Sequence, residues 1–372
     1  MFDDIRPYCD AEIPAAMQRI VADKYFPLVC EYLFPGRPVQ EIAAALGSCR
    51  TVKEFQERFM YDAIYAVVHK TTQGLTVEGM ERLDPAKDYL FVSNHRDIML
   101  DAAFFQVLLF DAGRKPSEIT FGANLMHGQM VIDVGRSNKM FRVERPTTVS
   151  SPRDFLLRSK YLSEYIRYTI TEKRESVWIA QRNGRTKDGI DATDQGVIKM
   201  FCLSEPTDKI KALADLNIVP VSVSYEWEPC DILKALELYE SQYTKYTKKP
   251  GEDLNSIITG LLQPKGNVHF ELCEPISVAE LVAFERLTNN EYHKAVARLL
   301  DRRINTAYRL YPNNYIAHDI RFGNTKYQDL YTPQQRQAFI KRMDKLERFD
   351  TCDLEQLRDI FLGIYSNPID NK

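Results

Sequence analysis

A polar turn at residues 93–101 carries the residue types that acid–base chemistry needs. His95, Arg96, Asp97 and Asp101 follow an apolar run there. Histidine can take a proton from a hydroxyl near neutral pH, and an aspartate on its other ring nitrogen fixes the tautomer. His95 and Asp101 are therefore a candidate catalytic pair. The open alternative is that Asn94 or Asp97 only caps the helix that follows, with His95 idle in the turn.

Two further loops are rich in basic residues. One spans residues 135–146 and contributes Arg136, Lys139, Arg142 and Arg145; the other spans residues 181–189 and contributes Arg182, Asn183, Gly184, Arg185 and Lys187. The guanidinium fork of arginine matches a phosphate, and glycine lets the backbone approach it closely. The two loops predict an anionic ligand.

A second hypothesis starts from the spacing of the two aspartates. Asp97 and Asp101 lie four residues apart, so on a helix they would share a face and could hold Mg²⁺. A metal-dependent phosphohydrolase is the enzyme class that this arrangement would serve.

The apolar runs predict an α/β fold, with a mixed, mostly parallel sheet flanked by helices. Strands are expected at residues 75–79, 89–93, 177–180, 217–225 and 268–273, and helices at 101–110, 152–173, 208–216, 278–311 and 333–365. Functional groups of open α/β sheets gather in the loops beyond the carboxyl ends of strands. The polar turns should therefore meet at one edge of the sheet.

The chain divides into three regions by pattern. Residues 1–73 are expected to be a helical N-terminal region, residues 74–312 the α/β domain, and residues 313–372 a charged, helical C-terminal extension.

Composition narrows the class of protein. The formal net charge of -3 argues against a nucleic-acid-coating protein. The seven cysteines form no C-x-x-C pair, so reduced thiols and no metal site are expected. The N-terminus lacks the pattern of a signal peptide, and no run of about 18 uncharged apolar residues occurs. These features favour a cytoplasmic protein that meets lipid, if at all, peripherally at the inner membrane surface.

Four blocks, in order, resemble the motifs of the glycerolipid acyltransferase family, which includes lysophosphatidic acid and glycerol-3-phosphate acyltransferases. They are SNHRDIMLD (93–101), MFRVER (140–145), VWIAQRNGRTKDG (177–189) and IVPVSVS (218–224). The resemblance covers roughly residues 75–280. It implies transfer of a fatty acyl chain from acyl-CoA or acyl-carrier protein to a hydroxyl of glycerol 3-phosphate, lysophosphatidic acid or a related polar lipid. It also implies a membrane surface as partner and no metal or redox cofactor.

The resemblance assigns roles to the first motif. His95 would be the base and Asp101 the residue that orients it. The family spacing H-x-x-x-x-D places its aspartate at Leu100, so Asp101 comes one residue late. A wider first helical turn could absorb the extra residue.

The later motifs supply the acceptor site. Arg145 would bind the acceptor phosphate, and Gly184 matches the glycine of a Glu-Gly pair whose glutamate is replaced by Asn183. Arg185 would supply the basic function that follows this pair, and Pro220 matches a structural proline. The replaced glutamate and the displaced aspartate leave a third hypothesis open, a lipid-binding protein without catalysis. The aromatic-rich segments 25–34 and 55–65 are candidates for lining an acyl groove.

Overall fold

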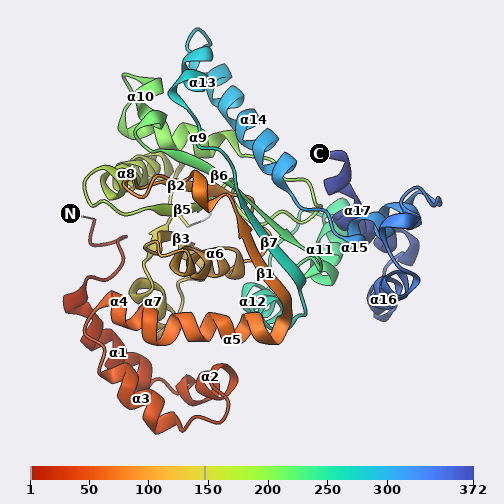
Figure 1. Cartoon of the computed structure of the whole chain (residues 1–372), viewed down its shortest axis with the longest axis horizontal. Coiled ribbons are helices and arrows are strands. Elements are labelled where there is room, and N and C mark those ends of the chain that lie inside the picture. The colour runs from red at the N-terminus through yellow and green to blue at the C-terminus, as the bar shows by residue number, and fades with distance from the viewer. Residues whose placement is uncertain (1, 146–147) are drawn as a thin grey trace.

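The computed structural model describes residues 2–145 and 148–372 and is built around one seven-stranded sheet (Figure 1). The strand order is β1-β7-β6-β2-β5-β3-β4, and among the described pairs only β6 and β7 run antiparallel. The predicted α/β class with a mixed, mostly parallel sheet is confirmed. The strands are β1 (Thr72–Glu78), β2 (Leu90–Ser93), β3 (Glu118–Gly122), β4 (Met140–Val143), β5 (Val177–Ala180), β6 (Ile218–Tyr225) and β7 (Gly266–Leu272).

The central strands are buried on both faces, which explains their continuous apolar sequences. Leu90 and Val92 of β2 point to one face of the sheet, while Phe91 points to the other. β6 lies between β2 and β7 although it contains Pro220. The carbonyl of Pro220 still accepts a hydrogen bond from Cys273 N at 2.9 Å, so the strand keeps a partner at this residue.

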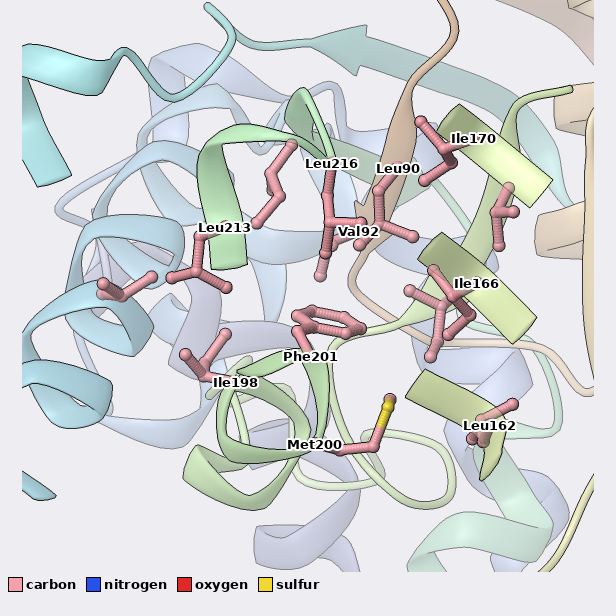
Figure 2. Packing of buried hydrophobic residues seen from close by; sticks show 14 of the residues in the cluster. Leu90, Val92, Leu162, Ile166, Ile170, Ile198, Met200, Phe201, Leu213 and Leu216 are labelled. Atoms are coloured by element: carbon pink, nitrogen blue, oxygen red, sulfur yellow. The ribbon is translucent and has the colours of Figure 1, made fainter. Parts of the chain in front are cut away.

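Five helices lie on the side of the sheet that Leu90 and Val92 face. They are α8 (Pro152–Thr171), α9 (Gln195–Phe201), α10 (Lys209–Ala214), α13 (Val278–Ala283) and α14 (Asn289–Ala307). Figure 2 shows Ile166 of α8 and Phe201 of α9 meeting the two β2 side chains in one apolar cluster. Burial of such side chains is the main favourable term in folding.

The opposite face is covered by α5 (Tyr61–Thr71) and α6 (Leu100–Asp111). Phe91 packs edge-on against Phe105 of α6, with ring centroids 4.9 Å apart. Helix α6 is buried over ten of its residues because it lies between the sheet and α5. This position makes α6, whose first turn holds Asp101, a rigid support.

The N-terminal helices form a small apolar cluster, in which α1, α2 and α3 lie below α5 while α4 lies beside α7 (Figure 1). They are α1 (Ile13–Ala22), α2 (Phe26–Leu33), α3 (Val39–Gly47) and α4 (Val52–Phe55), and α7 spans Gln129–Ser137. Arg19 of α1 bonds the buried Asp133 of α7, with Nη2 2.7 Å from Oδ1. The cluster is thereby tied to the chain between β3 and β4.

The C-terminal helices pack tightly onto the rest of the protein. They are α15 (Pro312–Arg321), α16 (Pro333–Met343) and α17 (Leu354–Asp370), and they share an apolar cluster with α11 (Asp231–Tyr243). The hydroxyl of Tyr365 donates to Asp231 Oδ2 at 2.7 Å. Gly189 meets α17 so closely that an added Cβ would lie 2.3 Å from Ile364 O. The three-way division of the chain at residues 73 and 312 stays a prediction.

Several elements differ from the sequence-based expectation. The two strands β3 and β4 were not predicted, nor were α7, α9, α11 and α12 (Glu252–Leu262). The single helix expected over 278–311 is divided between α13 and α14, because Ser277 and Thr288 each form a capping box that starts a new helix. In the described residues, no helix is long and apolar enough to cross a bilayer.

Candidate active site

The turn between β2 and α6 brings His95 and Asp101 together. His95 Nδ1 lies 2.9 Å from Asp101 Oδ2, and the Asp101 side chain is fully buried. The ring of His95 packs edge-on against Trp178 of β5, with centroids 6.0 Å apart. The second ring nitrogen, Nε2, is therefore the one left for a ligand. The pair has the geometry of a base and its orienting carboxylate, and the roles themselves stay predictions.

Asp101 is held from several directions. Its Oδ2 also accepts from the backbone N–H groups of Arg96 at 2.6 Å and Asp97 at 2.9 Å. Its Oδ1 accepts from the hydroxyl of Tyr225, at the end of β6, at 2.7 Å. The Tyr225 side chain is buried, and burial, with the negative charge of Asp101 beside it, raises its pKa well above its usual value. Tyr225 is thus a neutral hydrogen-bond donor to the carboxylate.

Asp97 has a different role from Asp101. Its Oδ1 accepts from the backbone N–H groups of Met99 at 2.9 Å and Leu100 at 2.8 Å, and so closes the turn before α6. The turn takes up the extra residue, because Asp101 still reaches His95 from the second position of the helix. The N-cap of α6 is Met99 rather than Asp97, so Asp97 shapes the turn ahead of the helix while His95 pairs with Asp101.

The carboxylates of Asp97 and Asp101 are both engaged by the backbone of the turn. Each uses an oxygen to accept backbone N–H groups, as given above, and the group of possible metal ligands found in the described residues lies elsewhere, at Glu78, His269 and Glu271. Arg309 and Arg82 bond those two glutamates at 2.6 Å each, which places positive charge where a cation would sit. The arrangement of the turn therefore favours a histidine base over a magnesium site.

Arg96 points away from His95 into a buried network of charges. Its Nη2 lies 2.6 Å from Asp191 Oδ2 and its Nη1 lies 3.3 Å from Glu228 Oε2, while Lys234 bonds Glu228 at 2.6 Å. Tyr308 stacks against the guanidinium at 4.9 Å. Removing one member would leave an uncompensated buried charge. Arg96 thus locks the turn onto the loop after β5.

A cavity of 540 Å³ opens beside His95. Its walls are mostly apolar and come from β3, β4, β5, α8 and α9. Along α8 it extends from Leu156, which is 52% exposed, past Ser159 to the buried Leu162. A cavity with one histidine and few polar groups in an apolar wall suits a ligand with a long apolar part.

Arg145 shares this cavity with His95. Its side chain is half-buried, and within residues 2–145 and 148–372 its guanidinium has no hydrogen-bond or ion-pair partner. Burial lowers its pKa, and the nearby Asp253 opposes that shift. Gly122 makes room for the group, since an added Cβ would lie 3.1 Å from both Nε and Nη2. A guanidinium that bonds no carboxylate among the described residues is available to pair with an anion.

The loop after β5 splits its predicted binding residues between two places. Asn183 and Gly184 line the cavity with His95 and Arg145, as does Arg182. Gly184 has a φ of +79°, which glycine adopts without strain. The hydrogen bond from Thr186 N to the carbonyl of His95, at 2.7 Å, joins this loop to the turn that holds His95 and Asp101.

Arg185 leaves the cavity side and points toward α11 and α12. Burial raises the pKa of the Cys230 thiol at the start of α11, and Arg185 nearby opposes that shift. The Nη1 atom of Arg185 is buried and has no partner among the described residues. Lys187 on the same loop bonds Glu237. The excess of positive charge predicted for this loop is thus only partly directed at the cavity.

Most of the other basic loop is used to hold the fold. Arg136 donates to the carbonyls of Arg6 and Asp3, and Lys139 bonds Glu175 at 2.7 Å. The expectation of one anion-binding cluster over residues 136–145 was wrong for Arg136 and Lys139, because neighbouring groups engage them.

The cavity lining corrects one expectation and adds residues that the sequence did not single out. The aromatic segments 25–34 and 55–65 do not contribute to it; their aromatic side chains pack in the N-terminal cluster and against α5 and α6. Tyr225, Gly122 and Trp178 were not predicted as site residues. Two signals in the sequence could have indicated Tyr225 and Gly122. Tyr225 is a polar aromatic residue at the end of an apolar strand, and Gly122 is the last residue of another strand.

A protein-family model matches the part of the chain that holds the candidate site. Residues 74–224 match the family model described as Acyltransferase. This match bears out the predicted resemblance to an acyltransferase family and the predicted enzyme class, an acyltransferase. Its limits contain all the site residues predicted from the four motifs.

The chain is also similar to a crystal structure of the 1-acyl-sn-glycerophosphate (LPA) acyltransferase PlsC from Thermotoga maritima. The two are 15% identical, the alignment covers 78% of this chain and 93% of that chain, and the TM-score is 0.36. A superposition this loose has no bearing on the site. No curated protein matches the chain.

Proposed function

We propose that this acyltransferase moves a fatty acyl chain from acyl-CoA or acyl-carrier protein to a hydroxyl of glycerol 3-phosphate, lysophosphatidic acid or a related anionic polar lipid. One observation carries the proposal: His95, oriented by Asp101, faces a mostly apolar cavity that also holds the guanidinium of Arg145, which has no partner among the described residues. The cavity thus combines a base, an anion site and an apolar wall.

The geometry supports direct transfer without an acyl-enzyme. Because Nδ1 of His95 faces Asp101, Nε2 takes the proton of the acceptor hydroxyl as its oxygen attacks the thioester carbonyl carbon. The C–O bond forms, the C–S bond breaks, and the proton passes from Nε2 to the departing thiolate. The Asp101 carboxylate stabilises the imidazolium between the two transfers.

Binding of the two substrates follows from the cavity walls. Arg145 pairs with the acceptor phosphate, and the Asn183 amide bonds a glycerol hydroxyl in place of the family's glutamate. The acyl chain lies along α8 between Leu156 and Leu162. Positioning of this kind can contribute several kcal/mol to the barrier reduction. Arg185 stays a predicted phosphate ligand, and it would have to act from the side of α12.

The test combines purified protein with acyl-CoA or acyl-carrier protein and a panel of acceptors, with products read by mass spectrometry. EDTA is present throughout, because the proposed reaction needs no metal. Product is expected with wild type and with His69→Ala, which removes an exposed histidine of α5, while His95→Ala should lose activity at least about a hundred-fold. Equal activity of the two variants would refute the proposal.

The two other hypotheses give different results in the same assay. A phosphohydrolase using Asp97 and Asp101 would release inorganic phosphate only after Mg²⁺ is restored. A lipid-binding protein without catalysis would retain lysophosphatidic acid on a size-exclusion column and form no product with any donor. Arg145→Gln should weaken acceptor binding under the acyltransferase proposal while leaving donor binding unchanged.

A further inference from the structure

Helix α12 exposes an apolar stripe to solvent. Leu254, Ile258 and Leu262 are 61%, 46% and 53% exposed, and their spacing of four residues places them on one face of the helix. The sequence from Leu254 to Pro264 contains no charged residue. Solvated helices normally carry charge on such a face, so this face is suited to an apolar environment.

The opposite face of α12 is fixed to the catalytic turn. Gly260 packs against Asp97 so closely that an added Cβ would lie 2.2 Å from Oδ2. Ser256 accepts a hydrogen bond from the Cys230 thiol through its carbonyl, at 3.2 Å. The stripe is therefore carried by a helix held against the site, between α5 and the strands β1 and β7 (Figure 1).

The turn before α12 is basic. Lys245, Lys248 and Lys249 are exposed, whereas the acidic residues beside them, Glu252 and Asp253, are half-buried. Lys248 bonds Asp253 and Lys249 lies 3.7 Å from Glu240, while Lys245 has no acidic partner among the described residues. Lysines next to an apolar helical face are the composition that binds an anionic lipid surface.

The N-terminus of α12 borders the cavity. Asn124, in the segment next to the cavity-lining Gly122 and Leu125, donates to Asp253 Oδ2 at 3.2 Å. Asp253 is also the acidic group that acts on the pKa of Arg145. A partner surface bound to the α12 stripe would therefore lie close to Arg145.

We propose that the apolar stripe of α12 and the lysines before it dock the enzyme on an anionic bilayer, so that lipid substrates reach Arg145 from the membrane. A bilayer is chosen as the partner of this face because the proposed acceptor is a lipid and because the turn before α12 is basic. The inference therefore rests on the proposed function. The exposed leucines of α8 are not assigned to this docking surface, because Leu156 lines the cavity itself.

The test measures co-sedimentation of the full chain with vesicles of phosphatidylcholine alone or mixed with phosphatidylglycerol. The variant Leu254→Ser/Ile258→Ser/Leu262→Ser removes the stripe. Its matched control, Val278→Ser/Val282→Ser/Leu287→Ser, removes three exposed apolar side chains near α13. Lys245→Glu/Lys249→Glu reverses the charge of two of the three lysines and spares the Lys248–Asp253 pair.

Wild type and the α13 control should bind the anionic vesicles, and the α12 variant should bind at least about ten-fold more weakly. The lysine variant should lose its preference for anionic over neutral vesicles. Equal binding of the α12 variant and wild type would overturn the proposal. So would a wild-type dimer, seen by size exclusion, that the α12 variant breaks while vesicle binding stays unchanged.

Acyl transfer to glycerol 3-phosphate from a short-chain acyl-CoA, without vesicles, is measured on the same variants. It should be unchanged in all of them. Undiminished vesicle binding by the α12 variant, with normal transfer in solution, would overturn the docking surface alone. Vesicle binding as expected, but no transfer by wild type or any variant, would overturn the proposed function alone.

Discussion

The hydroxyl of Tyr225, at the end of β6, donates a hydrogen bond to the carboxylate of Asp101 on α6, which in turn holds His95. Both Tyr225 and Asp101 are buried, so water cannot replace either partner. The orientation of the proposed base thus depends on a strand that supplies no group to the cavity itself.

Tyr225→Phe should lower kcat about ten-fold and leave KM for both substrates unchanged, because a hydrogen bond to a charged group is worth roughly 1.5–3 kcal/mol and this one acts only through His95. Steady-state kinetics with each substrate varied would measure this. Tyr292→Phe is the control, since it also removes a buried tyrosine hydroxyl, bonded to the carbonyl of Lys209 far from the site. A similar fall in both variants would show that the effect is structural.

Ser159→Phe should shorten the acyl chain that the enzyme accepts. Ser159 lies on the cavity wall between Leu156 and Leu162, so a larger side chain fills the space midway along α8. Activity with long-chain acyl-CoA should fall at least about ten-fold while activity with short-chain donors is kept. Lys160→Phe, which changes an exposed residue outside the cavity lining, should leave the chain-length profile as in wild type. An unchanged profile for Ser159→Phe would place the acyl chain elsewhere.

Gly189→Ala should destabilise the protein by about 2–4 kcal/mol, since it combines a left-handed backbone with a collision. The φ of Gly189 is +80°, and the new Cβ would lie 2.3 Å from the carbonyl oxygen of Ile364. Gly113→Ala isolates the backbone cost, because its φ is +71° and nothing lies within 4 Å of its Cβ position. Urea denaturation of both variants measures the difference between their free energies of unfolding. Equal losses of stability would show that α17 moves aside for the new methyl group at no energetic cost.

Lys265 should make stability depend on pH in the alkaline range. Burial lowers the pKa of its ammonium to about 8, although Asp97 nearby opposes this shift. Between that pH and the unfolded value of about 10.4, the unfolded chain binds more protons than the folded one, so the free energy of unfolding rises with pH. Below pH 8 the buried ammonium lowers the free energy of unfolding by about 3 kcal/mol. This destabilisation is lost as the pH approaches the pKa of the lysine in the unfolded chain.

Lys265→Met should remove this rise. Urea denaturation at several pH values from 7 to about 10 would compare the slopes. Lys53→Met serves as the control, because the Lys53 side chain is 80% exposed and its loss should leave the slope of wild type. Parallel curves for Lys265→Met and wild type would show that the buried ammonium keeps its usual proton affinity.

The sequence predicted the central strands best because their residues are apolar on both faces. β2, β5 and β6 fall within about a residue of their predicted ranges. β3 and β4 were missed, since the polar residues Glu118, Thr120 and Arg142 interrupt their short apolar patterns. Tertiary contacts cover these positions: Tyr165 donates to Glu118 at 2.5 Å, deep in the protein.

The candidate site was predictable where one motif supplies both partners, as with His95 and Asp101. It was not predictable where side-chain direction decides, because a loop sequence does not show which of its arginines turn inward. Arg145 enters the cavity while Arg185, on an equally basic loop, faces α12. Gly122 owes its importance to the Arg145 guanidinium beside it, which is distant in the sequence.

The contact of α17 with Gly189 also affects the order in which the enzyme becomes competent during synthesis. Residues 181–189 leave the ribosome long before residues 354–370, yet the loop reaches its final packing only against that late helix. The nascent chain therefore carries every motif residue before this packing is complete, and we expect the proposed acyl transfer to begin only after the C-terminal helices have packed against the sheet.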